Sequence, residues 1–155
     1  SWQGQEAPGE LPYYQQPIFT MHEGHFACRY ISAHIRSAQR FDDVPRLTEA
    51  QTEALELLTG LANDPKFHLA MMFEPGDVQL LNNHVTLHAR TEFEDYEEED
   101  QRRHLIRMWL SVPNSRPLSP ALGTIYRDRQ PGAVRGGFPS RTGKHQYYTT
   151  GGLQD

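Results

Sequence analysis

The most strand-like stretch of the sequence, residues 104–112, has one arginine inside it and another just before it. In a strand the side chains alternate, so Arg103, Leu105 and Arg107 would point to the same side. An arginine that faces a core needs a partner, because burying an unpaired charge is very costly. That partner is either a protein carboxylate or a bound anion, and the planar guanidinium fork suits a ligand carboxylate. The alternative is that both arginines lie on a solvated face.

The spacing of the two arginines bears on what they could bind. Arg103 and Arg107 are four residues apart, which is about 13 Å along a strand. One carboxylate is too small for both guanidinium groups to grip at that separation. We therefore expect the two arginines to bind different groups.

A second candidate group lies upstream, in residues 82–90. If this segment is extended, His84, Thr86 and His88 share one face. A neutral imidazole at the end of a strand is a good ligand for iron, copper or zinc. The chain has eight histidines, and a given histidine is more often a hydrogen-bonding residue than a ligand. The pattern alone therefore does not show whether His84 or His88 binds a metal.

Local signals in the first half predict a hairpin and two helices. Two apolar runs, 17–21 and 26–31, flank a short polar gap that contains glycine, which is typical of a β-hairpin. Residues 32–40 favour a short helix. Thr48 and Gln51 have the spacing of a capping box, which predicts that a longer helix starts there.

The longer helix should end at the Asn-Asp-Pro sequence of residues 63–65. Its apolar residues recur at helical spacing and predict ordinary core packing; they are Ala54, Leu57, Leu58 and Leu61. Further strand-like segments follow at 67–73, 78–81 and 84–90, separated by turns. Strands divided by turns, with helices inserted early, favour a β-sandwich or jelly roll with helical decoration.

Length and composition set the broad class. A chain of 155 residues suggests one domain. No apolar run approaches the roughly 20 residues that a membrane span needs, and the first residues lack the pattern of a signal peptide. The single cysteine, Cys28, excludes an internal disulfide and fits a reducing compartment, so we expect a cytoplasmic protein. We expect Cys28 to be a small buried strand residue rather than a nucleophile.

The acidity of the chain is local. The net charge is −5, and without the seven acids between Glu92 and Asp100 it would be +2. This balance argues against general nucleic-acid binding, which needs a basic face. The acidic run is either a solvated loop or a rim of the site that favours cationic substrates.

Two segments, 73–90 and 101–110, resemble the TauD/TfdA family of Fe(II)- and 2-oxoglutarate-dependent dioxygenases. In that family a Pro-Gly-Asp turn leads into a strand, then to Asn, and then to a His followed shortly by Arg; here these are Pro75 to Asp77 and Asn83 to Arg90. The resemblance covers roughly residues 12 to 120. It implies the C-terminal portion of a double-stranded β-helix (jelly roll), mainly β with a helical insert at about 32–65.

The resemblance also implies roles for particular residues. His88 matches the distal histidine that binds Fe(II), and Arg103 matches the arginine that binds the far carboxylate of the cosubstrate 2-oxoglutarate. Arg107 matches a position that helps to bind anionic substrates. Asn83 and Thr86 would hold the metal ligands in position without binding the metal themselves.

The sequence departs from the family's pattern in one respect. The family's His-x-Asp/Glu pair is absent, because none of the eight histidines has an acid two residues later. We expect that half of the iron site to lie before Ser1, which would leave this fragment inactive alone. The expected division is an extended segment at 1–16, the jelly-roll part at 17–115, and a tail at 116–155 that wraps the surface.

Three functional interpretations follow. The first is an oxygenase that hydroxylates a small organic molecule, which is an acid if Arg107 is free to bind it. For this enzyme we expect no nucleic-acid or membrane partner, and the sequence leaves open whether it forms a homo-oligomer. The second is a non-catalytic jelly-roll binding module that has lost its iron site. The third is an unrelated sandwich in which the arginines pair with acids such as Asp77 or Asp95.

Overall fold

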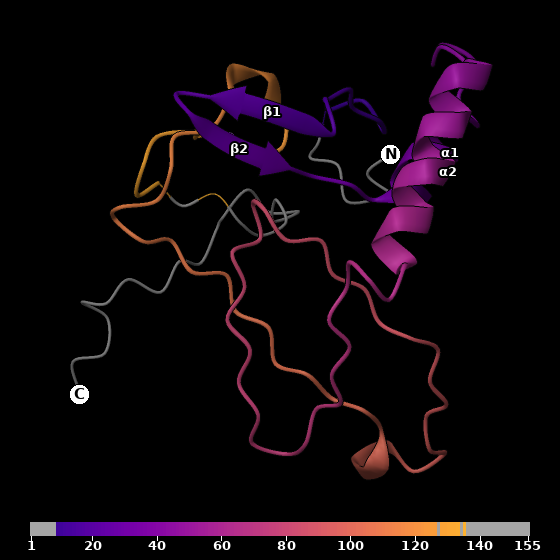
Figure 1. Cartoon of the computed structure of the whole chain (residues 1–155), viewed down its shortest axis with the longest axis vertical. Helices are drawn as coiled ribbons and strands as arrows, with labels where there is room; N and C mark the ends of the chain where they lie inside the picture. The colour runs from indigo at the N-terminus through magenta and orange to yellow at the C-terminus, as the bar shows by residue number, and fades with distance from the viewer. Residues whose placement is uncertain (1–8, 127, 134, 136–155) are drawn as a thin grey trace.

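The computed structural model describes residues 9–126, 128–133 and 135 (Figure 1). A two-stranded sheet and two α-helices occupy one end, and long irregular limbs of chain extend from them. The elements are β1 (Phe19–His22), β2 (His25–Cys28), α1 (Ser32–Ala38), α2 (Glu49–Asn63) and the 3-10 helices η1 (Glu99–Gln101) and η2 (Pro120–Leu122). In this described part of the chain, no helix has the length and apolar character needed to cross a membrane.

The predicted hairpin is confirmed. Strands β1 and β2 pair antiparallel, with Phe19 opposite Cys28 and His22 opposite His25. Glu23 and Gly24 form the turn with φ of 48° and 76°. Positive φ at both central residues is the geometry that matches the twist of paired strands, and glycine adopts it without cost. Cys28 is half-buried, and burial raises the pKa of its thiol.

Both predicted helices are present, and the capping box that begins α2 is confirmed. The Gln51 backbone N–H donates to Thr48 Oγ1 (3.2 Å), and the Thr48 N–H donates to Gln51 Oε1 (3.0 Å). The helix ends at Asn63, just before Pro65, as predicted. Tyr30, two residues after β2, donates its hydroxyl to the Leu55 carbonyl (3.2 Å) and lies 2.7 Å from Thr59 Oγ1. These contacts hold α2 beside the end of the hairpin.

The prediction that the apolar stripe of α2 packs in a core was wrong for this structure. None of the helix is buried; Leu57 is 63% exposed and Leu61 44% exposed. The amphipathic pattern specified the helix, but of the four stripe residues only Leu58 is half-buried and the others are exposed. A stripe of this kind is buried only when another element covers it.

The strands predicted at 67–73, 78–81, 84–90 and 104–112 are not strands in this structure. Within the described residues, ladder hydrogen bonds join only β1 and β2. A strand requires a neighbouring segment to receive and supply its backbone hydrogen bonds, and these runs have none. The predicted mainly-β character is therefore not confirmed here, and large apolar side chains on these limbs, such as Leu80 (82%) and Ile106 (84%), are exposed.

The buried core lies under the hairpin, not under α2. It consists of Ala27, Leu118, Leu122 and Tyr126, each at most 5% exposed. Three of these residues belong to the segment that was expected to wrap the surface as a tail. That expectation was wrong for 118–126, since Leu118, Leu122 and Tyr126 are buried in one cluster with Ala27 of β2. The remainder of the predicted tail from residue 136 on, and residues 1–8 of the extended segment, lie outside the described residues.

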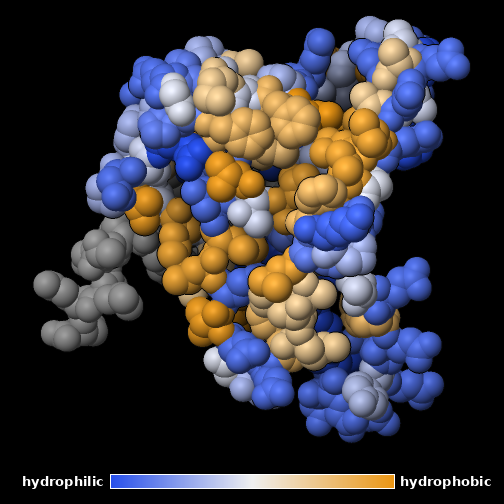
Figure 2. All heavy atoms as spheres, viewed as in Figure 1, coloured by the Kyte–Doolittle hydropathy of each residue, from blue (hydrophilic) through white to orange (hydrophobic). Residues whose placement is uncertain are grey.

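Polar and apolar side chains lie on separate parts of the molecular surface. Figure 2 shows apolar side chains gathered across the middle of one face and hydrophilic side chains at its lower right, by the acidic segment. The middle of that face includes limbs that the sequence marked as strands.

Candidate functional site

The segment that leads to His88 begins in a tight turn organised by Asn82. The carbonyl of Asn82 accepts from the N–H groups of Val85 and Thr86 (both 3.1 Å), and its side chain accepts from the His84 N–H (3.2 Å). Asparagine side chains commonly stabilise turns in this way. Asn83 is half-buried within the turn, whereas Thr86 is exposed.

His84 anchors this turn to the hairpin and the core. Its carbonyl accepts from the Cys28 N–H (2.7 Å), and its ring lies 5.6 Å from the ring of Tyr126 between centroids. Burial lowers the pKa of His84, and the positive charges of Arg135 and Arg116 lower it further. This histidine is therefore a packing residue that fixes where the segment to His88 starts.

His88 lies beyond the turn on an exposed, irregular limb. Across the part of the chain that is described, no three residues among His, Cys, Asp and Glu come together closely enough to hold a metal ion. A facial iron site needs two histidines and a carboxylate. The described residues therefore do not form an iron site by themselves, and His88 can provide at most one of its ligands.

Arg103 packs against an aromatic ring from the acidic segment. Its Cζ lies 5.3 Å from the centroid of the Phe93 ring, and the Cζ of Arg90 lies 4.9 Å from the same centroid. Both distances are within the cation–π range of about 6 Å. Arg90 follows His88 by two residues, so this contact brings the His88 segment and the arginine segment together. No hydrogen bond or ion pair joins His88 to Arg103 in the described part.

The acidic segment is closed into a loop by the residue before Arg103. Arg102 donates from Nε to the Tyr96 carbonyl (3.1 Å) and from Nη2 to the Glu97 carbonyl (2.8 Å). The Asp95 carboxylate accepts from the Arg103 backbone N–H (3.0 Å). These three bonds return the loop to the arginine segment, which places Phe93 beside Arg103.

The acids proposed as partners of the arginines bind backbone groups instead. Asp95 accepts from the Arg103 N–H, and Asp77 accepts from the Glu74 N–H (2.9 Å). Across residues 9–126, 128–133 and 135, neither Arg103 nor Arg107 forms a side-chain ion pair, and both are exposed. The guanidinium groups thus remain available to a ligand.

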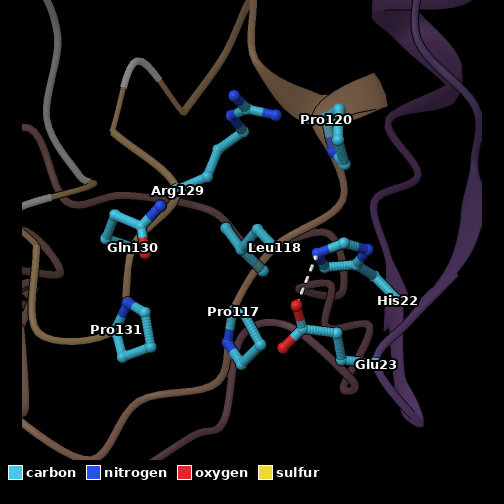
Figure 3. Close-up of a pocket in the computed structure, with 8 residues that line it drawn as sticks. All are labelled: His22, Glu23, Pro117, Leu118, Pro120, Arg129, Gln130 and Pro131. Carbon is cyan, nitrogen blue, oxygen red and sulfur yellow. Dashed lines mark ion pairs between the residues drawn. The ribbon is translucent and has the colours of Figure 1, made fainter.

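A cavity of about 320 Å³ lies elsewhere, between the hairpin turn and the segment after Pro117 (Figure 3). His22 and Glu23 form an ion pair at one side of it (3.7 Å). The other lining residues are Pro117, Leu118, Pro120, Arg129, Gln130 and Pro131. None of the predicted site residues lines this cavity, so it is separate from the site predicted around His88 and Arg103.

Known proteins place the chain in a family. Residues 1–109 match the family described as "Taurine catabolism dioxygenase TauD, TfdA family". The chain belongs to the TauD/TfdA family. The resemblance predicted from residues 73–90 and 101–110 is thereby confirmed, and the family implies a jelly-roll fold, of which the described residues show only a two-stranded sheet and two helices.

Two curated relatives agree with this assignment. "FR-33289 synthase" of Streptomyces rubellomurinus is 35% identical over 125 residues, which are 79% of this chain and 37% of that protein. "Taurine hydroxylase-like protein SAT17" of Stachybotrys chartarum is 34% identical over 105 residues, which are 64% of this chain and 26% of that protein. The chain therefore spans about a third of the length of these relatives.

Sequence reasoning named His88, Arg103 and Arg107 but missed the residues that arrange Arg103. Phe93 lies within the acidic run and Arg102 directly before Arg103, and neither was given a role from the sequence. The available signal was an aromatic ring three residues after Arg90, since guanidinium groups are attracted to aromatic faces.

Proposed function

We propose that this chain is part of an Fe(II)- and 2-oxoglutarate-dependent oxygenase that hydroxylates a small organic substrate. Family membership and relatives named as a synthase and as a hydroxylase-like protein support the proposal. In the whole protein His88 would supply one iron ligand, and residues beyond those described would supply the others. Iron with bound 2-oxoglutarate would provide the oxidation of the substrate by O2.

The observation that carries the proposal is the state of the Arg103 guanidinium. Seven acids lie between Glu92 and Asp100, close to it in sequence, yet within the described residues Arg103 packs on Phe93 and pairs with none of them. An arginine kept out of a protein ion pair retains its donors for an incoming carboxylate, which it can bind by two parallel hydrogen bonds. We assign it the distal carboxylate of 2-oxoglutarate.

The remaining residues have supporting roles in this proposal. Arg107 is exposed and unpaired among the described residues, so it is free to bind an acidic group of the substrate. Asn83 lies in the turn that orients the segment leading to His88, and Thr86 follows that turn. The single cysteine supports a reducing compartment, and we propose the cytoplasm.

We also propose that the exposed limbs become strands of a jelly roll in the whole protein. Apolar side chains on these limbs, such as Leu69 (82%), Met72 (89%) and Met108 (78%), are too exposed for a finished domain. Additional strands paired with these limbs would form hydrogen bonds with the backbone N–H and C=O groups of the limbs and would also cover their apolar side chains.

The test is turnover by the full-length protein that contains this chain, supplied with Fe(II), 2-oxoglutarate and O2. Succinate formation that requires all three is the expected result. Arg103→Ala should raise the KM for 2-oxoglutarate about ten- to hundredfold, because a hydrogen bond to a charged group contributes about 1.5–3 kcal/mol. Arg36→Ala, which removes an exposed arginine from α1, is the matched control and should leave that KM unchanged.

Two outcomes would contradict the proposal. If purified full-length protein binds 2-oxoglutarate but forms no succinate with iron, the non-catalytic binding module is favoured. If Arg103→Ala lowers stability without changing 2-oxoglutarate binding, the arginine is a structural residue and the site is elsewhere.

A further inference from the structure

The aromatic ring of Phe93 has two cationic neighbours from different parts of the chain. Arg90 follows the His88 segment, and Arg103 begins the arginine segment; their Cζ atoms lie 4.9 and 5.3 Å from the ring centroid. The ring is 42% exposed, so it is partly covered by these contacts and partly open to solvent. A single exposed phenylalanine is common on a protein surface, but this ring has two guanidinium groups within cation–π range, which is the geometry of a platform for cations.

The ring contact leaves the hydrogen-bonding capacity of Arg103 intact. The donors of a guanidinium point outward in its plane, whereas an aromatic ring is attracted to its charge without accepting those donors. A carboxylate partner would occupy the same donors that a ligand needs. Phe93 can therefore restrict the long Arg103 side chain, which otherwise loses rotamer entropy when it binds a ligand.

The loop geometry shows that the ring is held in place for this contact. Arg102 binds the carbonyls of Tyr96 and Glu97, and Asp95 binds the Arg103 N–H. These bonds close the loop at the start of the arginine segment, and closure returns Phe93 to Arg103. The seven acids of the loop remain exposed, while Phe93, one of its two aromatic residues, makes the cationic contacts.

We infer that Phe93 is a positioning residue that preorganises the Arg103 guanidinium for a dicarboxylate. The inference rests on the proposed function, because it assigns the dicarboxylate to the cosubstrate position. Arg90 places a second positive charge beside the same ring.

The experiment measures 2-oxoglutarate binding to the full-length, metal-loaded protein by calorimetry without O2, and in parallel KM and kcat by succinate formation. Phe93→Leu keeps the apolar bulk but removes the ring, and it should raise the Kd and the KM for 2-oxoglutarate about two- to fivefold, the range expected for a cation–π contact at a partly exposed site. The kcat at saturating 2-oxoglutarate and the melting temperature should stay unchanged. Phe93→Tyr, which retains the ring, should restore the wild-type Kd.

The matched control is Tyr96→Leu, in the same loop. Its side chain is 62% exposed, and Arg102 binds only its backbone carbonyl, which the substitution keeps. This variant should bind 2-oxoglutarate like the wild type.

The outcomes separate this inference from the proposed function. If Arg103→Ala weakens binding but Phe93→Leu does not, the positioning role is wrong and the proposed function stands. If Phe93→Leu and Tyr96→Leu weaken binding equally, the effect belongs to the loop as a whole and the positioning role is again wrong. If the wild type binds no 2-oxoglutarate, both are overturned.

Discussion

Replacing Leu122 by alanine tests whether the small core under the hairpin fixes the segment that leads to His88. Leu122 is 3% exposed and packs with Ala27, Leu118 and Tyr126. The substitution removes about three methylene equivalents, which corresponds to about 2.4 kcal/mol of lost burial. A cavity adds to this cost, but a core of four residues with half-buried neighbours can partly close. We therefore expect a loss of about 2.5–3 kcal/mol.

The assay is urea unfolding of the full-length protein together with amide exchange at Cys28. The Cys28 N–H donates to the His84 carbonyl, so its exchange reports whether the hairpin still holds the turn before His88. Leu122→Ala should lower the unfolding midpoint and accelerate exchange at Cys28. Leu11→Ala is the control, because Leu11 is already 61% exposed and should cost less than about 1 kcal/mol. An equal effect of both substitutions would refute the assignment of the core.

Two further predictions concern His84 and the acidic loop. Burial lowers the pKa of His84 below its ordinary 6.5, so as the pH falls the unfolded state takes up the proton first, and stability should be unaffected above pH 6.5 and fall below it. His84→Phe should flatten this part of a plot of melting temperature against pH. An unchanged slope would show that another group is responsible. Arg102→Ala removes two exposed hydrogen bonds that close the loop and should accelerate exchange of the Arg103 amide about tenfold, while Arg36→Ala should not; unchanged exchange would mean that the loop closes without Arg102.

Elements with local signals were predicted well from the sequence. Glycine in a two-residue gap specified the hairpin, and the reciprocal bonds of Thr48 and Gln51 specified the start of α2. Both signals act over three or four residues, so they need no partner from elsewhere in the chain. The family resemblance was also readable, because it lies in the order and spacing of residues within 73–110.

Elements that depend on distant partners were predicted less well. The strand-like runs at 67–73 and 104–112 have the right composition, but backbone pairing requires a neighbouring segment, and the described residues provide none. Packing of the stripe on α2 depends on a distant partner in the same way, and of its four residues only Leu58 is half-buried. Burial of Leu122 and Tyr126 was equally hidden, because a segment rich in proline and glycine gave no sign that it would return to the hairpin.

By itself, the sequence determined the family, the hairpin and the helices, and it named the residues to which the proposal assigns the chemistry. Tertiary structure alone decided that His84 is an anchor and that Arg103 rests on Phe93 rather than on one of seven nearby acids. The physical reason is that charge and composition describe what a side chain can bind. Which partner it meets depends on how segments far apart in sequence, such as β2 and the chain near Tyr126, are brought together by burial.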